Sequence, residues 1–210
     1  MCSVKLWKTE FFFLKKVSEL FVQNGAKSLT MDDIAKAFSI SKKTLYQNYK
    51  NKEVLLEEVL DFLLKQLLEQ LKAEEEKSLN PIEKMLLREP KIEQISENNR
   101  TVFVRQLIKY YPEIYNMHIV NVYKGIYEIF KHNVIKGREQ GLYEKDFDIE
   151  TYAKYFLELM FAFDSSPLFE EEQKIGRSNY CQGVVRFYLN AIVTPKGKEF
   201  LNQLTYNNEK

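Results

Sequence analysis

The residues best suited to chemistry lie in one short stretch, from Ser39 to Lys52. It holds lysines, hydroxyls, amides and tyrosines, but neither a catalytic cluster nor a glycine loop. Lysine can contact phosphates and guanine edges, and asparagine or glutamine can pair with adenine. Gathered over two or three helical turns, such side chains suit a surface that touches DNA. The stretch is therefore predicted to be the recognition end of a helix-turn-helix.

The rest of the sequence offers little for catalysis. The two histidines, His118 and His132, are too few and too far apart for a metal site. Acid–base catalysis by a carboxylate pair needs a pocket and a nucleophile, and the sequence indicates neither. We expect no enzyme activity, no metal and no cofactor.

The charge is divided unevenly along the chain. Ten lysines against four acidic residues give residues 1–52 a charge of about +6, whereas the whole chain carries +1 and the remainder therefore about −5. A basic head on an acidic body is expected when only the head meets a polyanion such as DNA. A membrane surface is the other polyanion to consider, but the basic segment reads as several short helices and not as one amphipathic helix.

Composition points to an all-α protein in the cytoplasm. Glycine and proline are scarce, at seven and five, which favours long helices. No apolar run is long enough to cross a bilayer, and no signal peptide is recognisable. The two cysteines, Cys2 and Cys181, make no disulfide framework and are expected to be free thiols. A redox role for Cys181 remains open.

Cap residues and apolar spacing outline a basic head. A first helix is expected from about Thr9 to Asn24, ended by Gly25. Thr30, with Asp33 three residues on, is predicted to cap a short second helix, and Ser41 a third whose inward anchor is Leu45. Asn51 is predicted to cap a fourth helix that reaches about Lys77. Its expected buried residues are Val54, Leu55, Val59, Phe62 and Leu63.

Further helices are expected through the remainder of the chain. They run from about residue 81 to 88, 100 to 111, 112 to 140, 149 to 163, 177 to 193 and 195 to 205. Breaks are expected at Pro90 and at Asn98-Asn99. The sum is an all-α fold of about nine or ten helices, with a three-helix head and a helical body.

From Phe13 to about Val59 the chain resembles the DNA-binding domain of the TetR family of bacterial transcriptional regulators. The matching residues are Leu20-Phe21, Gly25, Leu29-Thr30-Met31-Asp32-Asp33-Ile34-Ala35, Ser41-Lys42-Lys43-Thr44-Leu45-Tyr46, Tyr49 and Asn51-Lys52-Glu53-Val54-Leu55. They align without a gap. One departure is Ser39, which stands where this family often has glycine.

The resemblance implies two domains with different functions. Residues 1–52 would form the DNA-binding domain and residues 53–210 a ligand-binding and dimerisation domain. Thr30, Tyr46, Tyr49 and Lys52 fall where the family places contacts to the DNA backbone. The recognition helix begins at Ser41, and its expected base-reading surface consists of Lys42, Lys43, Thr44, Gln47 and Asn48.

The resemblance also implies a homodimer on palindromic double-stranded DNA, joined through helices at about 149–163 and 177–193. The expected dimer faces carry Tyr152, Phe156, Leu159, Met160 and Phe163 in the first helix, and Val184, Val185, Phe187, Tyr188 and Ile192 in the second. Twofold symmetry of the protein then requires a palindrome or near-palindrome.

A small-molecule inducer is the remaining partner that the resemblance implies. Aromatic residues expected to line its cavity are Phe103, Tyr110, Tyr111, Tyr115, Tyr123, Tyr127, Phe130, Phe156 and Phe163. The alternative is that these rings simply fill an apolar core. The function indicated is a ligand-responsive transcriptional regulator, most often a repressor in this family. The alternative is a DNA-binding or helical interaction protein that responds to no ligand.

Overall fold

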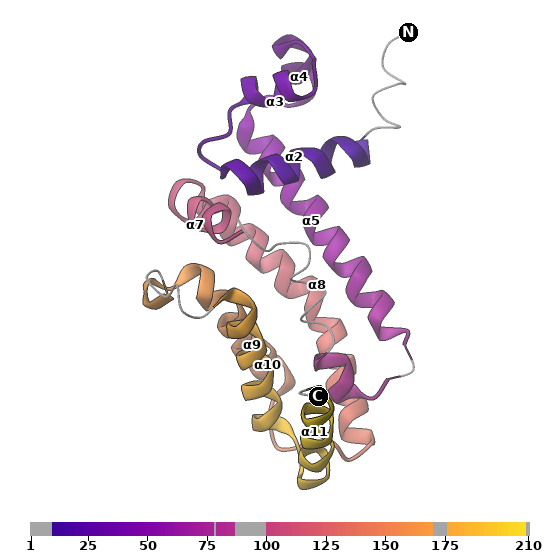
Figure 1. The fold of residues 1–210 in the computed structure, drawn as a ribbon. Helices are drawn as coiled ribbons and strands as arrows, with labels where there is room; N and C mark the ends of the chain where they lie inside the picture. The colour runs from indigo at the N-terminus through magenta and orange to yellow at the C-terminus, as the bar shows by residue number, and fades with distance from the viewer. Residues whose placement is uncertain (1–9, 78, 87–99, 170–175, 209–210) are drawn as a thin grey trace. The chain divides into compact units, whose positions relative to one another are not determined.

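The computed structural model describes residues 10–77, 79–86, 100–169 and 176–208 (Figure 1). Within these ranges the chain is built from helices, with one isolated β-bridge between Tyr143 and Val193. The helices are α2 (Glu10–Asn24), α3 (Met31–Ala37), α4 (Lys42–Asn48), α5 (Lys52–Glu75), α7 (Arg100–Tyr110), α8 (Pro112–Glu139), α9 (Ile149–Ser165), the single-turn 3-10 helix η1 (Pro167–Phe169), α10 (Arg177–Ile192) and α11 (Pro195–Asn208). Residues 81–86 are also helical. The all-α prediction is confirmed.

Side-chain caps fix where the short helices of the head begin. The Thr30 hydroxyl accepts a hydrogen bond from the Asp33 amide at 3.2 Å, and the Asp33 carboxylate accepts one from the Thr30 amide at 3.1 Å. Ser41 accepts from the Thr44 amide at 3.1 Å. These bonds satisfy amides at helix starts that have no partner within the helix. The predicted capping of α3 and α4 is confirmed, as is that of α5 by Asn51, which accepts from the Val54 amide at 2.9 Å.

The chain divides into two compact units, whose boundary cuts α5 after Leu67 and α8 after Val122. The first unit comprises residues 1–67 and 96–122, and the second comprises residues 68–95 and 123–210. The predicted division into domains at residue 52 remains a prediction. These units describe how the chain packs and do not test which parts fold or function separately.

The core of the first unit joins α2, α3, α4, the start of α5, and α7. Its fully buried side chains include Phe21, Ile34, Leu45 and Leu107. The predicted stripe of α5 is wrong at Val54, which is 40% exposed, whereas Leu56 and Leu60 are buried. The buried face of α5 is therefore rotated from the predicted one, because Leu55-Leu56 and Val59-Leu60 both pack inward.

The second unit has its own core, in which α8, α9 and α10 pack together. In α10 the residues Val184, Val185, Tyr188 and Ile192 are all buried within the protomer. Val185, Tyr188 and Ile192 belong to this core, so the protomer itself already covers them. The predicted dimer contact through this helix stays a prediction. Phe187 of the same helix is exposed.

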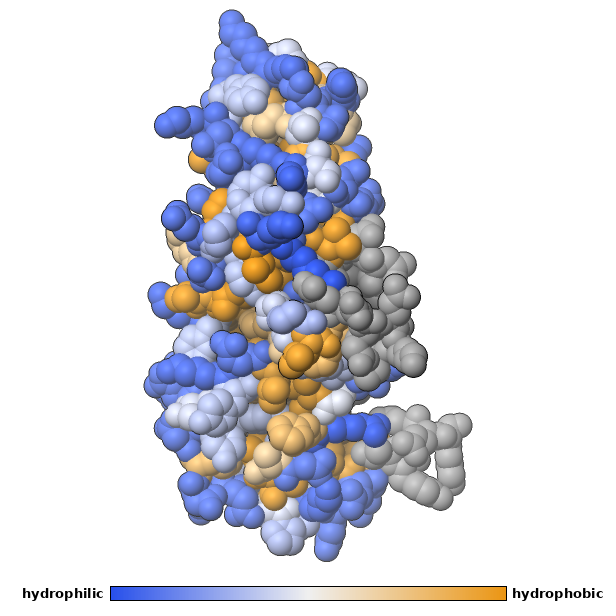
Figure 2. Space-filling model, turned by 90° about the vertical axis from the view of Figure 1, so that its left-hand side faces the viewer, coloured by the Kyte–Doolittle hydropathy of each residue, from blue (hydrophilic) through white to orange (hydrophobic). Residues whose placement is uncertain are grey.

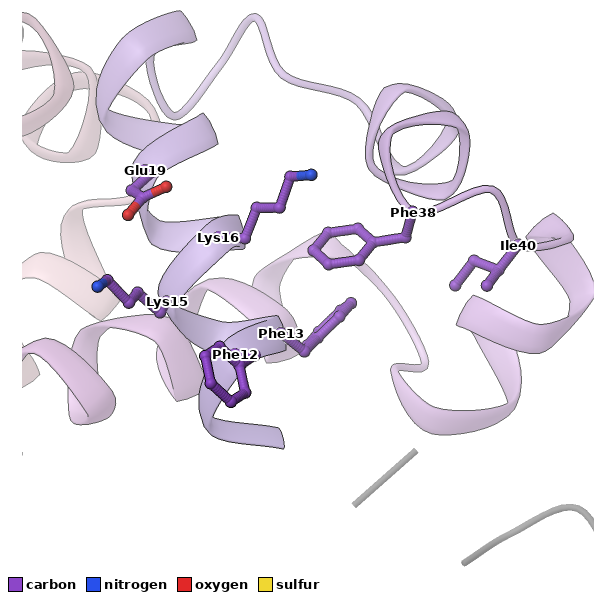
Figure 3. A pocket seen from close by; sticks show the side chains of 7 residues that line it. All are labelled: Phe12, Phe13, Lys15, Lys16, Glu19, Phe38 and Ile40. Atoms are coloured by element: carbon purple, nitrogen blue, oxygen red, sulfur yellow. The ribbon is translucent and has the colours of Figure 1, made fainter. Parts of the chain in front are cut away.

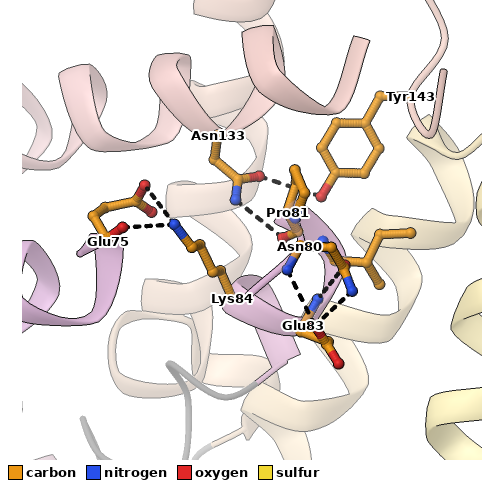
Figure 4. Close-up of polar contacts among 8 residues, drawn as sticks. Glu75, Asn80, Pro81, Glu83, Lys84, Asn133 and Tyr143 are labelled. Carbon is orange, nitrogen blue, oxygen red and sulfur yellow. Dashed lines mark hydrogen bonds and ion pairs between the residues drawn. The ribbon is translucent and has the colours of Figure 1, made fainter. Parts of the chain in front are cut away.

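A buried polar network ties several segments of the second unit together (Figure 4). The Lys84 ammonium donates to the Glu75 carbonyl at 2.6 Å, and its nitrogen lies 3.6 Å from the Glu75 carboxylate. Asn133 donates to the Pro81 carbonyl at 3.0 Å and accepts from the Tyr143 hydroxyl at 3.2 Å. These bonds join the end of α5, the helical turn at residues 81–86, and α8.

No helix in the described ranges is long and apolar enough to cross a membrane. The predicted breaks at Pro90 and at Asn98-Asn99, and the thiol of Cys2, lie outside the described residues. Cys181, in α10, is buried and is not part of a disulfide.

Candidate nucleic-acid interface

The turn between α3 and α4 decides how the candidate recognition helix is presented. The Ile40 amide donates to the Ala35 carbonyl at 3.0 Å, and the Ser39 amide donates to the Lys36 carbonyl at 3.0 Å. This pair of bonds is a Schellman motif, which requires a left-handed residue just after the helix. That residue is Ser39, with a φ of 53°. Serine thus occupies a conformation that glycine adopts at less cost.

Replacing Ser39 by glycine is expected to raise the free energy of unfolding by about 0.5–1 kcal/mol. The left-handed region costs an L-residue roughly 1–2 kcal/mol, and the greater freedom of glycine in the unfolded chain offsets part of that gain. Urea unfolding followed by circular dichroism measures the change. Ser39→Ala is the matched control and should lie close to wild type. A destabilised glycine variant would contradict the assigned strain.

Helix α4 separates buried from exposed side chains along its seven residues. Leu45 is 1% exposed and anchors the helix to the core of the first unit. The outward side chains are Lys42, Lys43, Tyr46, Gln47 and Asn48, and Thr44 is half-buried. Lys42 forms an ion pair with Asp32 of α3. The side-chain amide of Asn48 donates to the Thr44 carbonyl at 2.9 Å. The predicted recognition residues therefore all lie on this one short helix, whose single buried side chain is Leu45.

Tyr49 is a core residue, which corrects its predicted role as a phosphate contact. It is 7% exposed, and its ring stacks on Phe13 with centroids 5.7 Å apart. Burial, and then the nearby Glu58 carboxylate, raise the pKa of Tyr49 far above its usual range. The spacing carried this signal, because Tyr49 follows the anchor Leu45 by four residues and so lies on the same side of the chain.

Lys52 forms a hydrogen bond within the first unit, and its predicted contact with the DNA backbone stays a prediction. Its ammonium donates to the Lys27 carbonyl at 2.9 Å, and partial burial lowers the pKa of Lys52. The Lys27 amide donates to the Gln106 side-chain oxygen of α7 at 2.7 Å. The loop between α2 and α3 is therefore held through both the backbone N–H and the backbone carbonyl of Lys27. Sequence reasoning missed Gln106, because it lies 79 residues from its partner.

The predicted ligand-lining aromatic residues do not form one group. Phe103, Tyr111 and Tyr115 belong to the core of the first unit, whereas Tyr123, Tyr127, Phe130 and Phe156 belong to that of the second. Tyr110 lies at the surface, with the Lys27 ammonium 4.2 Å from its ring centroid. Phe163 packs against Phe169 and Tyr180. These residues are therefore divided between the two units, and their role in ligand binding stays a prediction.

Known proteins match the N-terminal part of the chain, which contains the predicted helix-turn-helix. The family described as bacterial regulatory proteins, tetR family, matches residues 14–59. A relative in Bacillus subtilis (strain 168), the "uncharacterized HTH-type transcriptional regulator YhgD", is 41% identical over 54 residues, which are 26% of this chain. The match spans only 28% of that protein's length.

Solved structures resemble the chain over most of its length at low identity. The TetR-family regulator PfmR of Thermus thermophilus has a TM-score of 0.61 at 21% identity, over 85% of this chain and 97% of that one. The reduced form of E. coli NemR has a TM-score of 0.72 at 15% identity, and the match covers 90% of this chain and 98% of that one. A putative transcriptional regulator from Saccharomonospora viridis, solved in complex with choline, has a TM-score of 0.70 at 17% identity. The match covers 87% of this chain and 96% of that one. At these identities the likeness establishes the fold alone.

Proposed function

We propose that this chain, whose residues 14–59 match the family of bacterial regulatory proteins, tetR family, is a dimeric repressor released from a palindromic operator by a small molecule. The head would read the operator through α4. The helical remainder of the chain would join two protomers and hold the inducer.

The observation that carries this proposal is the two-sided character of α4. A buried Leu45 fixes the helix, and the Ser41 cap fixes its start. Lysine, hydroxyl and amide groups then project from the opposite side. A helix of this kind fits the major groove, whose base edges present acceptors to lysine and paired donors and acceptors to amides.

Replacing Lys43, Thr44 and Gln47 together by alanine is expected to lower affinity for the operator by at least about 100-fold while leaving the fold intact. Each good base contact contributes about 1–3 kcal/mol of discrimination. An operator selected from random duplexes would serve as the probe, with fluorescence anisotropy as the readout. Lys65→Ala, an exposed lysine of α5, is the matched control. Unchanged affinity in the triple variant would rule out this face as the reading surface.

Dimerisation is proposed through the exposed side of α10. Phe187 is 67% exposed, and Gly183 lies one turn earlier with nothing within 4 Å of the position of a Cβ. A large exposed ring beside a flat glycine surface suits close packing against a symmetry-related helix. Figure 2 shows hydrophobic and hydrophilic residues intermixed over one face of the molecule.

The proposed inducer finds support in two buried hydroxyls of the second unit. The hydroxyls of Tyr123 and Tyr188 have no hydrogen-bond partner in the part of the chain that the structure describes. Buried polar groups normally have a hydrogen-bond partner, so each of these hydroxyls is a candidate to bond a ligand. The Tyr188 ring packs on Phe130 and Phe156, with centroids 5.4 and 4.9 Å away. We therefore propose that the inducer is an aromatic molecule with a hydrogen-bonding group, which would match these rings and hydroxyls in chemical character.

A ligand that raises the melting temperature and weakens operator binding would separate this function from that of a DNA-binding protein without an inducer. A ligand changes the balance of two states only by its difference in affinity for them, and a near-complete switch needs about 5.5 kcal/mol.

A further inference from the structure

A hollow beside the helix-turn-helix is not used by the function proposed above. It measures ≈ 570 Å³ and lies within the first unit (Figure 3). One wall is the first half of α2 and the other is the turn between α3 and α4. Its lining residues are Phe12, Phe13, Lys15, Lys16, Glu19, Phe38 and Ile40. We call this hollow the lysine groove.

The lysine groove is continuous with the proposed reading surface. Ile40 lines it, and the next residue, Ser41, caps the recognition helix. The Lys16 ammonium lies 5.5 Å from the centre of the Phe38 ring, at the end of α3. A cation placed there stands beside the turn that leads into α4.

The two lysines of the groove are available to an anion. Both Lys15 and Lys16 are exposed, and neither takes part in an ion pair in the described part of the chain. Lys42 of the recognition helix, by contrast, is paired with Asp32. The groove therefore presents positive charge that the protein itself leaves uncompensated, with Glu19 as its one acidic lining residue.

The apolar part of the groove suits the sugar of a nucleotide better than a phosphate. Phe12 is 67% exposed at its rim, while Phe13 packs on Phe38 with centroids 4.6 Å apart. The groove thus combines an exposed aromatic ring with two lysines on the same helix, and these suit the sugars and phosphates of a DNA strand. Phosphate and sugar contacts fix the position of a protein on the duplex.

We propose that the lysine groove is a second DNA contact, in which Lys15 and Lys16 bind backbone phosphates flanking the base pairs that α4 reads and Phe12 packs on a deoxyribose. The inference rests on the proposed DNA-binding function. It adds contacts that position the head and do not read sequence.

The test is the salt dependence of binding to a fluorescent mixed-sequence duplex of about 30 base pairs, long enough for two half-sites one helical turn apart. In Lys15→Ala/Lys16→Ala the slope of log affinity against log salt should become shallower by about 0.9 for each phosphate that is no longer neutralised, or about 1.8 for each bound head. At about 0.15 M salt this corresponds to roughly 30-fold weaker binding for each head. Phe12→Ser should weaken binding several-fold without changing the slope.

Two matched variants make the outcome decisive. Lys15→Arg/Lys16→Arg keeps the charge and should keep the wild-type slope, and Lys65→Ala removes an exposed lysine of α5 outside the groove and should also keep it. A wild-type slope in the double alanine variant, or an equal loss in Lys65→Ala, would overturn the groove contact. A wild-type protein that binds no duplex would instead overturn the proposed function itself.

Discussion

Replacing Phe187 by glutamate is expected to turn the proposed dimer into a monomer and to lower operator affinity by more than about 100-fold. The ring is the large apolar group that α10 leaves exposed within the second unit. A carboxylate buried at a self-complementary interface would meet its own symmetry mate and lose its hydration, a combination that costs several kcal/mol. A monomer engages one half-site and loses the added affinity of the second.

Sedimentation velocity and fluorescence anisotropy on the selected operator measure the two effects. Met117→Glu is the matched control, because Met117 is another exposed apolar residue, on α8 in the first unit, and should leave the dimer intact. A dimer that survives Phe187→Glu at micromolar concentration would place the interface elsewhere.

Replacing Leu45 by alanine is expected to reduce the free energy of unfolding by about 2–5 kcal/mol, the range for buried leucines cut to alanine. Leu45 is the buried side chain of α4, and α4 is too short to be stable without it. The recognition helix should lose its fixed position, and DNA binding should fall with it. Urea unfolding and anisotropy report the two losses.

The neighbouring Tyr46→Ala is the matched control for Leu45→Ala. Tyr46 is exposed, so its loss should change stability by no more than about 0.5 kcal/mol while weakening DNA binding. The two variants would then separate the stability of the head from its contacts. Equal destabilisation by both would contradict the assigned orientation of α4.

Most of the head was predictable because its determinants are local. A cap such as Thr30 or Ser41 acts on an amide three residues later, and the spacing of Phe21, Ile34 and Leu45 records which sides turn inward. Prediction failed where a residue type pointed one way and packing another. Tyr49 has a polar hydroxyl that suits a phosphate, but its ring completes the core against Phe13.

The ligand and dimer surfaces were less predictable for a different reason. Tyr110 and Tyr123 were both predicted to line the ligand cavity, yet they lie in different units, which only the tertiary structure reveals. An amphipathic helix also does not say which neighbour covers its apolar side. In α10 that neighbour is the protomer's own core, which takes Tyr188 and leaves Phe187 outside.

The hold on Lys27 has a consequence for hydrogen exchange. Loop amides usually exchange their protons with solvent rapidly, but this one donates to Gln106 of α7. Its proton can leave only when this hydrogen bond opens. The exchange rate of a single backbone amide therefore reports how often the contact between this loop and Gln106 is broken, and comparing that rate with and without DNA would show whether binding tightens the contact.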